Sequence, residues 1–190
     1  MRNTPLMILG VIVLVLVLAI GWGVSTYNGL VRADQAVKGQ WAQVETQLQR
    51  RYDLIPNLAN SVASYNQHEA GVFTSIAESR AKIGGGITPE NAATLDKQYY
   101  SALSRLLVIT EAYPQLKSNE NYIRLMDNLE GTENRISTER QRYNQAVTDF
   151  NARIKTVPTV FVARFGGFGE KTFFQAPPEA QSAPQVFPPK

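Results

Sequence analysis

The sequence predicts an all-α protein in which a single N-terminal transmembrane helix continues into a long antiparallel bundle of three long helices, followed by a short C-terminal segment. Two observations lead to this prediction. Residues 6–24 form an apolar run without charged residues, about as long as a helix must be to cross a hydrocarbon core of roughly 30 Å. From Leu30 onward, apolar residues recur at alternating steps of three and four, which is typical of a helix that packs lengthwise against other helices.

The apolar run is interpreted as a retained membrane anchor, with Trp22 and Tyr27 near the lipid headgroups. A cleaved signal peptide is the alternative. The run is long for such a peptide and no clean small-residue cleavage site precedes Tyr27, so the anchor is favoured. The amino terminus and Arg2 flank one end of the run, and Arg32 and Lys38 flank the other. Two positive charges on each side leave the orientation open.

The first bundle helix is expected over residues 27–83, a rod of roughly 85 Å. Pro56 lacks a backbone N–H and crowds the preceding turn, so we expect a kink near residues 51–55. The repeat keeps its phase across the proline, which favours a kink over a break. Glycines 84 to 86 then end the helix. The repeat defines the first seam as Leu30, Asp34, Val37, Trp41, Val44, Leu48, Arg51, Ile55, Leu58, Val62, Tyr65, Glu69, Val72, Ile76, Ser79 and Ile83.

Two further helices are expected, over residues 89–113 and 119–156. Thr88 suits the N-cap, Pro89 suits the first helical position, and Pro114 disfavours helix at the residue before it. The apolar face of the second helix is Leu95, Tyr99, Ala102, Leu103, Leu106 and Ile109. The third seam is Tyr122, Met126, Leu129, Glu133, Ile136, Arg140, Tyr143, Val147, Phe150 and Ile154. Short loops join antiparallel neighbours, so the first and third helices are expected to be parallel, with the second between them.

The chain after the bundle (27–157) changes in composition. Six of the eight phenylalanines lie after Pro158, and most of them are interleaved with glycines in residues 158–175. This Gly/Phe-rich segment is either a short helix or loop packed on the bundle, or an apolar patch for another surface. Residues 176–190 are rich in proline and are expected to be extended or disordered.

Composition argues against several kinds of site. The 19 Lys and Arg against 16 Asp and Glu give a net charge of +3, and between residues 27 and 156 the two signs nearly balance, so the clustered cations of a nucleic-acid interface are missing. Cysteine is absent, which excludes disulfides and thiolate metal sites, and a single histidine, His68, excludes a multi-histidine metal site. We therefore expect no cofactor and no small-molecule substrate.

Four of the charged residues on the seams are candidates for a network: Arg51, Glu69, Glu133 and Arg140. They either reach water from the edge of the seam or form a buried charge network that fixes register and oligomeric state. From the helical rise, Arg105 is expected near the level of Glu69. We therefore expect Glu69 to pair with Arg105 or Arg140, and Arg51 to pair elsewhere or meet solvent.

Two motifs that invite a catalytic or phosphate-binding interpretation do not support one. His68 and Glu69 are adjacent, so on a helix their side chains point about 100° apart. Glycines 84 to 86 are neither preceded by a predicted strand nor followed by Lys-Ser, as a phosphate-binding loop would be. No catalytic, cofactor-binding or metal-binding residue is assigned.

Several short stretches of the chain together match one known family. They are Tyr27-Asn28-Gly29-Leu30-Val31, Arg50-Arg51-Tyr52-Asp53-Leu54-Ile55-Pro56-Asn57-Leu58, His68-Glu69, Ala112-Tyr113-Pro114-Gln115-Leu116-Lys117, Glu130-Gly131-Thr132-Glu133-Asn134-Arg135-Ile136 and Arg142-Tyr143-Asn144. On these stretches the chain resembles the LemA family of bacterial membrane proteins, from the anchor to about Phe174. The resemblance implies a single-pass protein of the bacterial cytoplasmic membrane with a long helical bundle. It does not indicate which side of the membrane carries the bundle. It brings no enzymatic activity. A family member takes part in forming magnetosome membranes, which implies membrane shaping or scaffolding by analogy.

The expected function is therefore that of a membrane-anchored, non-enzymatic scaffold or interaction protein that self-associates and possesses no catalytic site. Its expected partners are the lipid bilayer and either further copies of itself or other membrane proteins. The alternative is an adaptor or regulatory subunit of another membrane complex, such as a protease or signalling system. Packing of the Gly/Phe-rich segment on the bundle favours the scaffold, whereas its exposure favours docking, since contiguous apolar patches usually mark contact surfaces.

Overall fold

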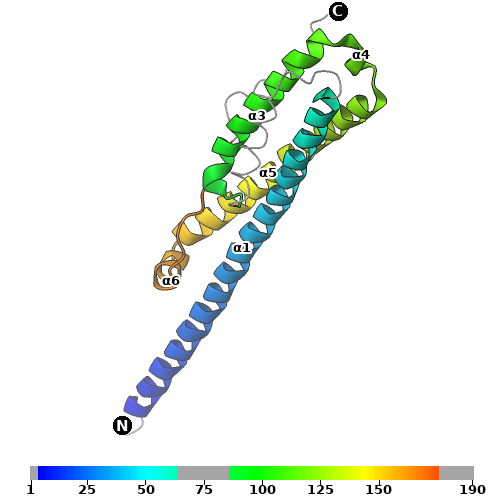
Figure 1. Ribbon diagram of the computed structural model, residues 1–190. Helices are drawn as coiled ribbons and strands as arrows, with labels where there is room; N and C mark the ends of the chain where they lie inside the picture. The colour runs from blue at the N-terminus through cyan, green and yellow to red at the C-terminus, as the bar shows by residue number, and fades with distance from the viewer. Residues whose placement is uncertain (1–3, 64–85, 176–190) are drawn as a thin grey trace, which may run out of the picture. The chain divides into compact units, whose positions relative to one another are not determined.

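The computed structural model describes residues 4–63 and 86–175. Within these ranges every regular element is a helix, so the all-α prediction is confirmed. The elements are α1 (Thr4–Ala63), α3 (Pro89–Ala112), α4 (Pro114–Lys117), α5 (Glu120–Lys155) and α6 (Thr159–Phe165) (Figure 1).

The chain forms two compact units. The anchor unit comprises Met1–Gly39 and Gln145–Lys171, and the bundle unit comprises Gln40–Asn144 and Thr172–Lys190. Helices α1 and α5 each contribute residues to both units. The anchor unit also holds α6, and the bundle unit also holds α3 and α4.

Helix α1 runs without interruption for 60 residues. It includes the apolar run at residues 6–24, whose side chains are almost all exposed, and among the described helices it is the one long and apolar enough to cross a membrane. The predicted continuity between the run and the bundle is therefore confirmed. Pro56 lies inside the helix and does not break it. Residues 64–83, the remainder of the predicted first helix, lie outside the described ranges.

The predicted seams are the packed faces of the helices. From Leu30 to Val62 every seam position is buried except Trp41, which is half-buried. On α5 the seam is buried except at Met126, Glu133 and Arg140, which are half-buried. The three-four repeat thus identified the buried side chains because burial along a helix follows its period.

Helix α3 begins with the predicted cap. The Thr88 hydroxyl accepts a hydrogen bond from the Asn91 N–H at 3.3 Å, and the Asn91 side chain accepts one from the Thr88 N–H at 2.8 Å. These reciprocal bonds satisfy two otherwise unpaired backbone donors. Gly86, just before the cap, has φ +88°, a left-handed conformation that favours glycine.

The short helix α4 was not predicted. The sequence argument used Pro114 only as the end of the second helix, but proline also suits the first position of a new one. In the structure Pro114 opens α4, and Leu116 within it is completely buried.

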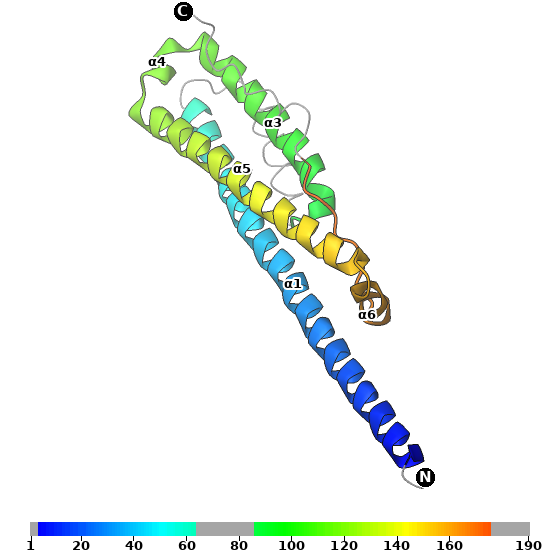
Figure 2. The same ribbon diagram turned by 180° about the vertical axis from the view of Figure 1, so that it is seen from behind.

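The predicted helix directions are wrong. In the bundle unit, the Trp41 ring packs on Tyr143 at 5.2 Å and its indole N–H donates to the Ile87 carbonyl at 3.3 Å. Further along α1, Arg51 pairs with Asp96 and Glu133. Residue numbers therefore rise together along α1 and α3 and fall along α5, so α1 and α3 are parallel and α5 is antiparallel to both, as Figures 1 and 2 show.

The prediction assumed a tight turn between the first and second helices. A tight turn at glycines 84 to 86 would start α3 beside the far end of a helix reaching Ile83, and α3 would then run back along it. Instead, Ile87 lies beside Trp41, near the start of the bundle unit's part of α1. The second helix therefore starts at the same level as that part of α1 and runs in the same direction.

Candidate functional site

A buried ion cluster lies in the bundle unit around Arg51, whose side chain is 1% exposed. Its guanidinium donates to the carboxylate of Asp96, which is also buried, and to both carboxylate oxygens of Glu133 at 3.3 and 3.4 Å. Glu133 is half-buried, with 30% of its side chain exposed. One cation on α1 is thus held by one anion on α3 and another on α5.

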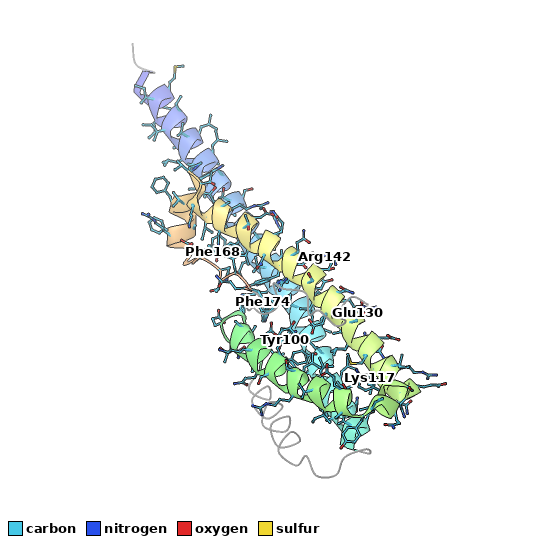
Figure 3. All side chains as sticks on the ribbon, turned by 90° about the horizontal axis from the view of Figure 1, so that it is seen from above. Tyr100, Lys117, Glu130, Arg142, Phe168 and Phe174 are labelled. Carbon is cyan, nitrogen blue, oxygen red and sulfur yellow. The ribbon has the colours of Figure 1, made fainter. Side chains whose placement is uncertain are left out.

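Three tyrosines surround the same guanidinium. Its central carbon lies 4.1 Å from the ring centre of Tyr99, 5.1 Å from that of Tyr52 and 5.6 Å from that of Tyr100. These distances fit cation–π attraction, which is stronger where water is excluded. Tyr100, labelled in Figure 3, also donates its hydroxyl hydrogen to Glu133 at 3.2 Å.

The ionisation of these groups follows from their burial and neighbours. Burial raises the pKa of Tyr52 to about 12, and burial together with Glu133 raises the pKa of Tyr100 to about 12. Burial raises the pKa of Tyr99 well above its ordinary value. For Arg51, burial lowers the pKa, but Asp96 and Glu133 outweigh burial and the net shift is upward. The cluster therefore holds a permanent cation and neutral phenols at neutral pH.

The properties of the cluster suit a structural role more than a catalytic one. Replacing one partner of a buried pair strands the other charge, so a register that separated Arg51 from its carboxylates would be strongly disfavoured. The three tyrosines are protonated near neutral pH and do not supply a general base there. Among the described residues, no three His, Cys, Asp or Glu side chains are grouped to hold a metal ion.

The predicted network residues have different positions. Arg51 and Glu133 are brought together, as partners of each other. Arg105 is exposed on α3 and Arg140 is half-buried on α5, and neither is among the groups bonded to Arg51. Glu69 lies outside the described ranges, as does His68, so the pairing of Glu69 with Arg105 or Arg140 stays a prediction.

Sequence reasoning missed Asp96. The apolar face predicted for the second helix included Leu95 and omitted the adjacent Asp96. A strict four-three count from Ala92 gives Ala92, Asp96, Tyr99, Leu103, Leu106 and Thr110, and all of these are buried except the half-buried Leu103. An acidic residue on one seam and a basic residue on another were the signal that could have paired Asp96 with Arg51.

A second constellation ties the chain after α6 to α5. In the bundle unit, the Asn144 side chain accepts from the Phe174 N–H at 2.9 Å and donates to the Phe174 carbonyl at 3.1 Å. In the anchor unit, Asn151 makes the same two bonds with Lys171, at 2.8 and 3.0 Å. Each asparagine side chain thus makes the pair of hydrogen bonds, one donated and one accepted, that a backbone peptide group makes in a β-sheet. Asn144 and Asn151 are two helical turns apart, a spacing that places them on one face of α5.

An ion pair adds to this attachment in the anchor unit. The Lys171 ammonium lies 2.6 Å from the carboxylate of Asp34. Burial raises the pKa of Asp34, but Lys171 and Lys38 outweigh burial and lower it overall. Asp34 lies on the predicted first seam, but no partner was predicted for it.

The Gly/Phe-rich segment is partly packed and partly exposed. Phe174 is 1% exposed and meets Trp41 edge-on at 5.8 Å in the bundle unit. Phe168 packs against Tyr27 at 5.5 Å in the anchor unit; both phenylalanines are labelled in Figure 3. Phe161 and Phe165 on α6 are 60% and 97% exposed. The packed and the exposed alternatives considered for this segment each describe part of it.

Known proteins place this chain in a family. The sequence model of the LemA family matches residues 40–187. Magnetosome proteins MamQ 1 and MamQ 2 of Paramagnetospirillum magneticum are 26% identical to the chain over an alignment that covers 85% of this chain and 70% of each relative. Magnetosome protein MamQ of Magnetospirillum gryphiswaldense is 24% identical over 98% of this chain and 79% of the relative. Protein LemA of Metamycoplasma hominis is 24% identical over 80% of this chain and 70% of the relative. With the family model covering most of its length, the chain belongs to the LemA family.

Proposed function

We propose that this protein is a single-pass, membrane-anchored scaffold of the bacterial cytoplasmic membrane that works by association and not by catalysis. The observation that carries the proposal is the continuity of α1. One helix contains both the exposed apolar run at residues 6–24 and the buried seam from Leu30 to Val62. A helix of this kind links a bilayer directly to a packed helical domain.

The buried ion cluster supports a structural role for the bundle unit. Polar groups on a helical seam can specify register and oligomeric state at some cost in stability. Arg51, Asp96 and Glu133 come from three different helices, so they are well placed to select one arrangement of those helices. A cluster of this kind suits a protein that binds its partners through one fixed arrangement of helices.

Self-association is tested on the full chain extracted from membranes in mild detergent. Two differently tagged copies are produced in the same cells, and one is captured. We expect the second copy to be retained, and the particle mass to exceed that of one chain. As a control, the two copies are produced separately and mixed only after extraction, which reports exchange in detergent. A strictly monomeric particle with no retained copy or partner would contradict the scaffold.

A second candidate function is an adaptor for another membrane complex. Exposed Phe161 and Phe165 favour it, because large exposed apolar side chains often mark contact sites. The test is capture of a defined protein partner by the full chain and by Phe161→Ser/Phe165→Ser. Loss of that partner with self-association intact would favour the adaptor over the scaffold.

A further inference from the structure

Helix α6 lies against the end of the apolar run in the anchor unit. An apolar groove of about 400 Å³ is lined by Gly23, Val24 and Tyr27 of α1, and by Phe161 and Phe165 of α6, with the following turn. Gly23 and Val24 are the last two residues of the uncharged run. One wall of the groove is therefore the carboxyl end of the proposed membrane span.

Several contacts fix α6 at this level of α1. The Tyr27 and Phe168 rings meet at 5.5 Å. A Cβ atom on Gly166 would lie 2.9 Å from the Tyr27 ring and 2.7 Å from the Phe168 ring, so glycine permits the close approach. Lys171 then pairs with Asp34 at 2.6 Å. These contacts attach the segment to α1 at the boundary between the apolar run and the first charged residues.

Two of the exposed side chains on α6 are large and aromatic. Phe161 and Phe165 are one turn apart, so they share a face of the helix, and they are 60% and 97% exposed. Val157, just before α6, is 72% exposed. Arg164 is the single charged residue of α6 and is exposed. Aromatic rings beside a long cationic side chain are typical of segments that lie in a membrane interface.

We infer that α6 is a second membrane contact: Phe161, Phe165 and Val157 insert at the boundary between headgroups and acyl chains, and a lipid chain fills the groove. The inference rests on the proposed anchoring of α1. If residues 6–24 cross the bilayer, Gly23 and Val24 mark its edge, and α6 at their level lies at the same depth. Arg164 then reaches lipid phosphates.

The bilayer is favoured as occupant over a second copy of the chain. Gly23 and Val24 belong to the face that the bilayer covers along residues 6–24, so the groove continues a lipid-facing surface without a polar boundary. A protein occupant would have to displace lipid from these residues.

The test uses single-cysteine variants of the full chain, which has no native cysteine. Leu14→Cys lies in the span, Phe165→Cys in the proposed contact, and Gln35→Cys is an exposed control on α1 beyond the span. Each is labelled with an environment-sensitive fluorophore and reconstituted in vesicles of phosphatidylcholine and phosphatidylglycerol. Quenchers are attached either deep or shallow on the lipid, and iodide reports water access. Phe161→Cys repeats the measurement one turn away.

For Phe165→Cys we expect a blue-shifted emission and several-fold stronger quenching by the shallow lipid quencher than for Gln35→Cys, with weaker quenching by iodide. Lipid quenching at Leu14→Cys, with Phe165→Cys and Phe161→Cys behaving like Gln35→Cys, would overturn the second contact alone and leave the anchor standing. Shielding of Phe165→Cys from both lipid quenchers and iodide would show a protein occupant and also overturn it. Absence of lipid quenching at Leu14→Cys would overturn the anchor and the inference with it.

Discussion

The guanidinium of Arg51 and the carboxylate of Asp96 face each other between α1 and α3, and their side chains are 1% and 4% exposed. Each is the reason that the other can be buried. An isolated ion in a protein interior is strongly disfavoured, whereas a paired and hydrogen-bonded one is tolerated. This relationship makes the two residues interdependent, which mutations can measure.

We predict that Asp96→Ala destabilises the protein by roughly 3–5 kcal/mol, because it leaves the buried Arg51 with the half-buried Glu133 as its one remaining anionic partner among the described residues. The free energy of unfolding is measured by chemical denaturation of the full chain in detergent. Asp127→Ala, an exposed aspartate on α5, is the matched control and should change little. Arg51→Met/Asp96→Leu should recover much of the loss. Equal effects of the two single alanine variants would show that Asp96 is not a buried partner.

The sequence was sufficient to predict burial but insufficient to predict how the helices meet. Positions such as Leu48 and Ile136 are buried as the local repeat predicts, because the period of a helix and the hydrophobic effect act on neighbouring residues. The pairing of Trp41 with Ile87 depends on the path of the chain between the helices, which no local pattern encodes. Asp96 was missed for a related reason: a charge on a seam is informative only when its partner on another helix is known.

The side-chain bonds of Asn144 and Asn151 to the backbone also lay beyond the sequence argument. Asparagine carries no apolar signal, and its partners, Phe174 and Lys171, belong to a segment without a regular period. Their two-turn spacing becomes meaningful only when an extended segment is known to run along that face of α5.

A core substitution tests the packing of α3. Leu106 is completely buried, whereas Val108 on the same helix is 68% exposed. We expect Leu106→Ala to destabilise the protein by about 2–5 kcal/mol, since it removes buried methyl groups and leaves a cavity. Val108→Ala should have little effect. Thermal and chemical unfolding of both variants provide the measurement, and a negligible effect of Leu106→Ala would contradict the assigned face of α3.

Alkaline pH should weaken the bundle unit through its buried tyrosines. Burial raises the pKa of Tyr52 to about 12, above the value of about 10 for an exposed tyrosine. The native state therefore holds the proton more tightly, so the stabilisation is fully present below about pH 10 and is lost as pH rises towards about 12. Tyr52→Phe should flatten this decline in the free energy of unfolding. Tyr113→Phe, at the end of α3, is the comparison, and an identical pH dependence of both variants and the parent would argue against a buried Tyr52.

The turn after α6 offers a test of backbone conformation. Gly167 has φ +71°, and a Cβ atom there meets nothing within 4 Å, so Gly167→Ala should cost about 1 kcal/mol from the left-handed conformation alone. Gly169→Ala also meets nothing within 4 Å, and Gly169 has no left-handed φ. Amide exchange at Lys171, whose N–H donates to Asn151, reports the local stability. We expect roughly fivefold faster exchange in Gly167→Ala than in Gly169→Ala. Equal exchange in the two variants would contradict a left-handed conformation at residue 167.

The attachment of residues 168–174 to early parts of the chain has a consequence for biosynthesis. Phe168 packs on Tyr27 and Phe174 on Trp41, so each compact unit includes residues translated after all five described helices. Domains generally begin to fold from the N-terminal side during synthesis, but here neither unit can be completed until this segment has left the ribosome. Until then Trp41 lacks Phe174 as a cover, and the amides of Asn144 and Asn151 lack their backbone partners. A nascent chain stalled before residue 168 would therefore present an open face of α5 to any chaperone or membrane surface nearby.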